Sequence, residues 1–145
     1  MSYDVIVVGG GPAGATAAED LARSGVSVAL LDRAGRIKPC GGAIPPRLMQ
    51  DFDIGDDQLL TKVNTARMIS PTGRKVDIPI ENGFVGMVDR KDFDPFLRDR
   101  AVKAGADYHE GTCLKITRED GTPRSHYRER ATGETRSLDA KRGIG

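Results

Sequence analysis

Residues 3–25 read YDVIVVGGGPAGATAAEDLARSG and join a strand pattern, a glycine-rich turn and a helix pattern in one stretch. The apolar run at 3–8 contains successive β-branched residues, which is typical of a parallel strand buried on both faces. Ala and Leu then recur at helical spacing. We therefore predict a helix over 12–24, with Pro12 in its first turn and Gly25 as its C-terminal cap.

The run VSVALLD at 26–32 is again apolar and rich in strand-forming residues. It completes a strand–helix–strand unit, in which we expect two parallel strands joined by a right-handed crossover. The opening of the chain therefore predicts an α/β fold.

The turn between the first strand and the helix reads GGGPAG at 9–14, which fits the G-x-G-x-x-G fingerprint of dinucleotide-binding folds. We predict that Gly9 permits the tight turn, that Gly11 lets the backbone approach a pyrophosphate, and that Gly14 lets helix and strand pack closely. The alternative is a tight strand-to-helix turn that binds no ligand.

We expect the anion at the start of the predicted helix, where Pro12 and Ala13 lie at the positive end of the helix dipole. Asp32 ends the second strand 18 positions after Gly14, where its carboxylate can accept hydrogen bonds from ribose hydroxyls. An acid at this position disfavours a 2′-phosphate. The residues thus leave FAD and NAD as candidate nucleotides for the site and disfavour NADPH there.

Charge and composition exclude other classes of protein. The 22 basic and 21 acidic residues give a net charge of +1, so we expect no nucleic-acid partner. Cys40, Cys113, His109 and His126 lack the spacing of a disulfide framework or a metal site, and we predict no metal. The N-terminus lacks a signal-peptide pattern, and no apolar run approaches the roughly 18 residues that span a bilayer. These features favour a cytoplasmic location.

The middle of the chain carries strand patterns. KVNTARMISPTGRKVDIPI at 62–80 predicts two strands joined by the turn SPTG, with Val76, Ile78 and Ile80 on one face. GFVGMVD at 83–89 predicts a third strand.

A second helix is predicted from DFDPFLRDRAVKAGA at 92–106, ending at Gly105. The apolar side of this helix consists of four residues: Phe93, Phe96, Leu97 and Ala101. YHEGTCLKITRED at 108–120 and SHYRERATGETRSLDA at 125–140 are predicted strands around the turn DGTP, and in the first of them we expect Cys113 to belong to the core.

Three stretches together resemble the geranylgeranyl reductase family: DVIVVGGGPAGATAA at 4–18, KPCGGAIPPRL at 38–48 and MVDRKDFDPFLRDRAVKAGA at 87–106. This family comprises flavoenzymes that saturate the prenyl chain of chlorophylls, bacteriochlorophylls or archaeal lipids. The chain is most similar to its photosynthetic-bacterial branch. The resemblance implies an aromatic-hydroxylase-like flavoprotein fold: a Rossmann-like FAD-binding domain with a parallel sheet and an inserted antiparallel β-hairpin.

The resemblance also implies a chemistry. FAD would be the cofactor and NADPH the external reductant, with hydride passing from the reduced flavin to a prenyl double bond. Cys40 would stand near the reacting edge, either as a proton donor or as part of the pocket wall. Gly41 and Gly42 would let the backbone approach the flavin ring closely. Arg90 would contact the flavin phosphate or ribityl region, and Arg33 would border the adenine.

In the family, a second flavin motif and a substrate domain follow the stretch matched here. We therefore expect residues 1–145 to be an incomplete FAD-binding domain of a longer enzyme, inactive by itself. The expected substrate is a prenylated pigment or a prenyl diphosphate, and so apolar a substrate favours peripheral membrane association of the full enzyme. Two other functions stay open: the flavin domain of a related FAD-dependent monooxygenase, and a non-catalytic nucleotide-binding module.

Overall fold

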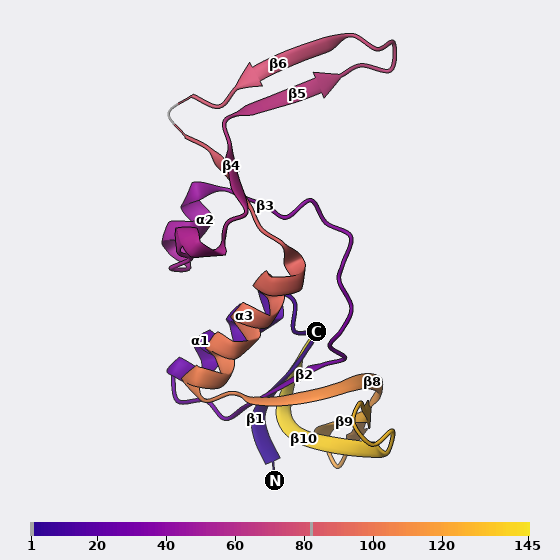
Figure 1. The fold of residues 1–145 in the computed structure, drawn as a ribbon. Coiled ribbons are helices and arrows are strands. Elements are labelled where there is room, and N and C mark those ends of the chain that lie inside the picture. Colours follow the sequence, from indigo (N-terminus) through magenta and orange to yellow (C-terminus); the bar gives the residue numbers. More distant parts are fainter. Residues whose placement is uncertain (1, 82) are drawn as a thin grey trace. The chain divides into compact units, whose positions relative to one another are not determined.

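The computed structural model describes residues 2–81 and 83–145, and the chain divides into two units (Figure 1). The first unit contains residues 2–36 and 94–145, and the second contains residues 37–93. In the sequence, the second unit is therefore an insertion into the first.

The first unit begins with the predicted strand–helix–strand arrangement. Its elements, in chain order, are β1 (Ser2–Val8), α1 (Pro12–Arg23), β2 (Val28–Asp32), the larger part of α3 (Arg90–Ala104), β8 (Asp107–Glu119), β9 (Thr122–Glu129) and β10 (Thr135–Ile144). Helix α1 ends one residue before the predicted end. Gly25 follows in the left-handed region with φ of +78° and donates its N–H to the carbonyl of Ala22, which caps the helix. Strand β2 begins two residues later than predicted.

The strands of the first unit close into a ring in the order β1-β10-β9-β8-β2. Strand β1 pairs in parallel with both β2 and β10, and β2 pairs in parallel with β8. The C-terminal part of β8 and the N-terminal part of β10 pair with β9 in antiparallel fashion. In Figure 1 these long strands curve away from the parallel sheet, so β8, β9 and β10 form a meander beside it.

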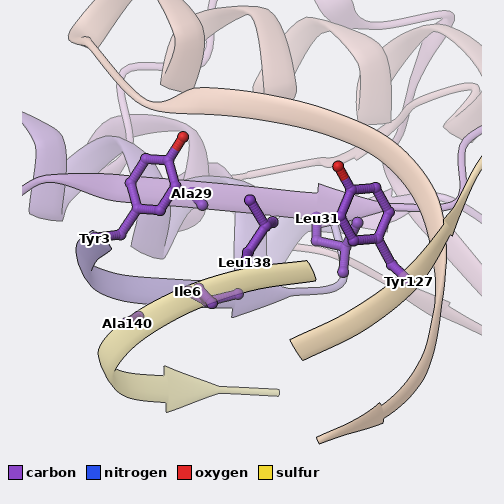
Figure 2. Close-up of a cluster of buried hydrophobic side chains, with 7 residues drawn as sticks. All are labelled: Tyr3, Ile6, Ala29, Leu31, Tyr127, Leu138 and Ala140. Atoms are coloured by element: carbon purple, nitrogen blue, oxygen red, sulfur yellow. The ribbon is translucent and has the colours of Figure 1, made fainter. Parts of the chain in front are cut away.

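Two clusters of buried side chains cover the two faces of the parallel sheet. On one face, Val7 and Leu30 pack against residues of α1 and α3 such as Ala18 and Ala101. On the other face a second cluster joins the sheet to the meander, as Figure 2 shows. The members of this second cluster are Tyr3, Ile6, Ala29, Leu31, Tyr127, Leu138 and Ala140. A fully buried aliphatic side chain stabilises a fold by about 1.5–3 kcal/mol, so these two layers hold the first unit together.

The second unit consists of short elements. They are β3 (Ala43–Ile44), α2 (Pro46–Asp51), the 3₁₀ helix η1 (Asp56–Gln58), β4 (Thr61–Val63), β5 (Thr65–Ile69), β6 (Lys75–Pro79), β7 (Val85–Met87) and the start of α3. Strand β7 lies between β3 and β4 in a three-stranded antiparallel sheet, whereas β5 and β6 form a separate hairpin. Within the described parts of the chain, no helix is long and apolar enough to cross a membrane.

The predicted hairpin is confirmed, with one difference. The turn at SPTG is present, because the Gly73 N–H donates to the carbonyl of Ser70 at 2.9 Å. However, the first predicted strand is broken at Asn64 into β4 and β5, so the stretch at 62–80 contains three strands instead of two. Strand β6 ends at Pro79, which leaves Ile80 just outside it.

The later elements agree with the sequence pattern except at 125–140, where one strand was predicted. Helix α3 ends where Gly105 adopts a φ of +112°. On its predicted apolar side Phe93, Leu97 and Ala101 are buried and Phe96 is half-buried. The stretch at 125–140 contains parts of two strands, β9 and β10, because a second turn at 130–134 divides it.

Candidate nucleotide-binding site

The glycine-rich turn links the end of β1 to the start of α1 and is shaped by two close backbone contacts. Gly9 has a φ of +111°, a conformation that residues other than glycine rarely adopt, and it donates its N–H to the carbonyl of Leu31 at 2.8 Å. A Cβ atom on Gly14 would lie 1.8 Å from the Gly9 carbonyl oxygen. Glycine is therefore required at both positions to bring the helix against the strand.

The N-terminus of α1 offers backbone donors to an anion. Gly11 is the N-cap residue in an extended conformation, and within the described chain no side chain caps this helix end. The first turn contains Pro12, which has no N–H, followed by Ala13 and Gly14. The free N–H groups after Pro12 and the helix dipole together suit a phosphate group.

Asp32, at the end of β2, points its carboxylate at the glycine turn. Its Oδ2 atom accepts the N–H of Gly10 at 2.8 Å, and its Oδ1 atom accepts the N–H of Ala34 at 2.8 Å. A carboxylate oxygen has two lone pairs, so each oxygen of Asp32 keeps capacity for a further donor. The Nη1 atom of Arg98, on α3, lies 3.7 Å from Oδ1.

A cavity of about 240 Å³ opens at the carboxyl ends of β1, β2 and the first part of β8. It is lined by Val8, Gly9, Leu31, Asp32, Arg33, Gly111, Thr112 and Cys113. The volume is below the roughly 300–1,000 Å³ of pockets that take whole drug-sized ligands, and so it suits one part of a dinucleotide. The structure thus brings Gly9, Asp32 and Arg33 together at one cavity, with the N-terminus of α1 at the end of the same turn.

The donors and acceptors at this site fit a dinucleotide. Acceptor capacity on Asp32 suits ribose hydroxyls, the helix N-terminus suits a pyrophosphate, and the cavity beside Arg33 suits a base. Within residues 2–81 and 83–145, no group of three His, Cys, Asp or Glu side chains could hold a metal ion.

Residues of β8 at the cavity were not identified from the sequence. Strand β8 pairs with β2 through Glu110, and Gly111, Thr112 and Cys113 follow directly. Cys113 was expected in the core; it is half-buried, packs against the core cluster and also lines the cavity, and burial raises the pKa of its thiol. The rule that ligands bind at the carboxyl ends of parallel strands could have indicated these residues, had β8 been recognised as a third parallel strand.

The other predicted site residues lie in the second unit. Cys40 is exposed, and its Sγ atom accepts the N–H of Gly42 at 3.5 Å. Gly42 has a φ of +68°, and a Cβ atom there would lie 2.0 Å from the carbonyl oxygen of Val88. A Cβ atom on Gly41 would meet nothing within 4 Å. Arg90 is half-buried at the start of α3.

The packing against Val88 is by itself a structural reason for glycine at position 42. The Gly42 carbonyl also accepts the Val88 N–H at 2.8 Å, which holds the loop in place. Close approach to a flavin is a separate hypothesis for this position.

Comparison with known proteins agrees with this geometry. A family profile described as "FAD binding domain" matches residues 2–145. A geranylgeranyl diphosphate reductase from Rhodobacter capsulatus is 63% identical over 145 residues, which is the whole of this chain and 37% of that protein. The chain therefore spans little more than a third of this relative's length.

Solved structures give the same fold. A geranylgeranyl bacteriochlorophyll reductase-like protein from Thermoplasma acidophilum matches 98% of the chain and 38% of its own length, with a TM-score of 0.84 and 29% identity. Aklavinone-11 hydroxylase, solved with FAD and aklavinone, matches 99% of the chain and 32% of its own length, with a TM-score of 0.71. Since it is only 20% identical, it shows the shared fold alone.

These matches confirm two predictions, the aromatic-hydroxylase-like flavoprotein fold and the similarity to geranylgeranyl reductases. The glycine turn and the carboxylate at the end of β2 are features of dinucleotide-binding folds. The chain belongs to the FAD binding domain family.

Proposed function

We propose that the chain is the FAD-binding part of a flavoprotein reductase that saturates a geranylgeranyl chain to phytyl, with NADPH as the external reductant. The observation that carries this proposal is the 63% identity to a geranylgeranyl diphosphate reductase over all 145 residues, together with a cavity that suits one part of a dinucleotide. The substrate would be a prenylated pigment or a prenyl diphosphate. Peripheral association of the full protein with a membrane surface would bring it to so apolar a substrate.

Residues of the first unit would hold the adenosine and pyrophosphate parts of FAD. The N–H groups of the turn from Gly11 to Gly14 would donate to the pyrophosphate. Asp32 would accept from the adenosine ribose hydroxyls through its remaining lone pairs, and Arg33 would border the adenine in the cavity. We propose that these contacts provide most of the affinity for the cofactor.

Residues of the second unit would contact the other end of the cofactor. Arg90 would donate to the flavin phosphate or ribityl region, since a guanidinium can grip phosphate oxygens with two hydrogen bonds. Gly41 carries no side chain and has open space around it, which suits close approach by a flat ring. Gly42 would support the same loop through its contact with Val88.

Bound FAD supplies hydride transfer, and the protein supplies position, exclusion of water and a proton. Cys40 is the candidate proton donor, because its thiol is exposed on the loop beside Gly41 and Gly42. The other role for Cys40 is to shape the pocket wall. In both roles its side chain would face the prenyl chain.

The first test concerns the glycine turn in the full-length protein. Gly11→Val would place a branched side chain where the pyrophosphate must approach, and we expect purified protein without bound flavin. Flavin content is read from the visible absorption spectrum, and circular dichroism confirms that the variant is folded. A folded, fully flavin-loaded Gly11→Val protein would contradict the proposed site.

The second test concerns Asp32. Asp32→Ala removes hydrogen bonds to a charged group, on the order of 1.5–3 kcal/mol, so FAD affinity should fall roughly ten- to a hundredfold. The matched control is Asp139→Ala, which removes another strand carboxylate of the same unit that pairs with Arg124 outside the cavity. Unchanged affinity for Asp32→Ala would remove Asp32 from the site.

The third test concerns Cys40. Cys40→Ala should leave flavin content near normal and change prenyl reduction. Loss of a proton donor would slow the chemical step by ~10² or more, whereas loss of a pocket wall would mainly alter substrate fit or the number of bonds saturated. Single-turnover oxidation of reduced enzyme by a geranylgeranyl substrate, with product analysis, distinguishes the two. Rapid NADPH-dependent oxygen consumption without prenyl reduction would instead indicate a monooxygenase.

A further inference from the structure

Gly10 is the glycine of the turn to which the dinucleotide fingerprint assigns no role. A Cβ atom on Gly10 would lie 2.8 Å from the Cδ atom of Arg98 and 2.9 Å from the Cβ atom of Asp32. The space beside Gly10 is therefore filled by these two side chains. Any residue larger than glycine at position 10 would displace one or both of them.

Arg98 and Asp32 hold the two ends of Gly10 by hydrogen bonds. The N–H of Gly10 donates to Asp32 Oδ2 at 2.8 Å, and the carbonyl of Gly10 accepts from Arg98 Nη1 at 3.0 Å. Arg98 Nη1 also lies 3.7 Å from Asp32 Oδ1. These contacts form a closed ring, which we call the Gly10 clasp, consisting of Gly10, Asp32 and Arg98.

The clasp is preorganised by burial. The side chain of Arg98 is 14% exposed and that of Asp32 is 19% exposed. Because both charges are largely removed from water, they are stabilised by each other and by hydrogen bonds to backbone groups. The guanidinium of Arg98 lies 5.9 Å from the centre of the Tyr108 ring, which restricts its orientation. Arg98 itself does not line the cavity.

We propose that Arg98 is a positioning residue of the nucleotide site, which acts through Asp32 and the Gly10 peptide and not by contact with the ligand. Arg98 holds the Asp32 carboxylate toward the turn. In this position the remaining lone pairs of the carboxylate can accept hydrogen bonds from ribose hydroxyls. Arg98 also offsets the negative charge of Asp32 beside the expected pyrophosphate. The inference rests on the proposed function, because it assumes that the cavity and the N-terminus of α1 bind FAD.

The test is a double-mutant cycle on FAD affinity in the full-length protein freed of flavin. The variants are Arg98→Met, Asp32→Ala and both together, and the dissociation constant is measured by flavin fluorescence titration. We expect Arg98→Met alone to weaken FAD binding by about tenfold, and the double variant to bind no more weakly than Asp32→Ala. Such non-additivity is what a residue acting through Asp32 produces.

Two further variants separate positioning from general stability. Arg98→Lys keeps the charge but lacks the planar fork, and it should recover part of the lost affinity. Arg100→Met is the matched control, because Arg100 lies on the same helix and pairs with the buried Glu19 of α1, away from the turn. We expect Arg100→Met to change thermal stability while FAD affinity stays within about twofold of the parent.

Three results would overturn the inference. One is a folded Arg98→Met protein with parental FAD affinity, and another is losses from Arg98→Met and Asp32→Ala that simply add. The third is an equal loss of affinity in Arg100→Met, which would make the effect one of helix packing. Failure of the FAD assignment, the part of the proposed function on which the inference rests, is distinguishable from all three, because the parent protein would then bind no FAD.

Discussion

The parallel sheet of the first unit and the β5–β6 hairpin of the second contain the same kinds of residue in opposite environments. In the sheet, Ile6 and Leu30 are 1% and 0% exposed. In the hairpin, the pairings Ala66–Ile78 and Met68–Val76 place apolar side chains on one face, yet Met68 is 61% exposed. Strand-forming residues thus build a strand in both places, and only the sheet has layers that cover them.

The other face of the hairpin is mixed, because it carries an ion pair and also the exposed Ile69. Arg67 lies opposite Asp77 and donates to it through Nε at 2.6 Å and Nη2 at 2.8 Å. An isolated two-stranded hairpin is marginally stable in water, and one exposed ion pair adds little. Burial on two faces therefore distinguishes the stable core of this chain from the hairpin.

The largest expected effect tests the covered region at its tightest point. Gly14→Ala places a Cβ atom 1.8 Å from the Gly9 carbonyl oxygen, which neither backbone segment can avoid without separating α1 from β1. We expect a loss on the order of 4 kcal/mol in the free energy of unfolding, measured by urea titration. Gly41→Ala, in the second unit, meets nothing within 4 Å and serves as the control. A Gly14→Ala protein as stable as that control would contradict the close packing.

The next effect compares one buried and one exposed aliphatic residue. Leu30→Ala empties a fully buried position, so we expect a loss of about 2–5 kcal/mol. Ile78→Ala acts at a side chain that is 49% exposed, and we expect a change within about 0.5 kcal/mol in this chain. Both are measured by thermal or urea unfolding of the 145-residue protein. Equal losses would mean that the apolar face of the hairpin is covered in solution.

The two cysteines give a smaller contrast in reactivity. Cys40 is exposed, whereas Cys113 is half-buried and burial raises the pKa of its thiol, which lowers the fraction of reactive thiolate. Iodoacetamide should therefore label Cys40 faster, as followed by peptide mass spectrometry in flavin-free full-length protein. In a Cys40→Ser variant, added FAD should slow labelling of Cys113 further, because Cys113 lines the cavity. Equal labelling rates at the two cysteines would show that their environments do not differ as described.

The smallest expected effect is a pH dependence at His109. Burial lowers its pKa, while Asp107 and Glu129 act in the opposite direction. The rings of Tyr3 and Tyr127 enclose it, each 6.1 Å from its own ring centre. The unfolded state, with a histidine pKa near 6.5, therefore binds more protons than the folded state once the pH falls below about 6.5.

Acid should thus lower the free energy of unfolding through His109. The stabilising contribution of neutral His109 is fully present only above about pH 6.5. Urea titrations at a series of pH values across this range should give a free energy of unfolding that depends less steeply on pH in His109→Gln than in the parent protein. The same slope in both proteins would contradict the lowered pKa.

Much of the first unit could be predicted because its signals are local. Buried parallel strands read as continuous apolar runs, and the crossover between them carries its own cap at Gly25. The break at Asn64 and the burial of the hairpin could not be predicted, since both depend on which strands pair and on what covers them. The pattern Val76, Ile78 looks the same whether that face is covered or not.

The candidate site divides in the same way. Gly9, Gly14 and Asp32 were indicated by spacing alone, because a strand–turn–helix unit fixes their separation along the chain. Arg98 lies 66 residues after Asp32, and only the packing of α3 on the sheet brings the two together. No local pattern distinguishes it from the other charged residues of that helix.

By itself, then, the sequence determined the strand–turn–helix that opens the chain and the residue types at its turn, since these depend on contacts within about 30 residues. The tertiary structure decided which residues of β8 border the cavity, which arginine of α3 meets Asp32, and which apolar faces are covered. Those outcomes depend on pairings between distant segments. Their free energy comes from burial and from hydrogen bonds that exist only when the whole unit has folded.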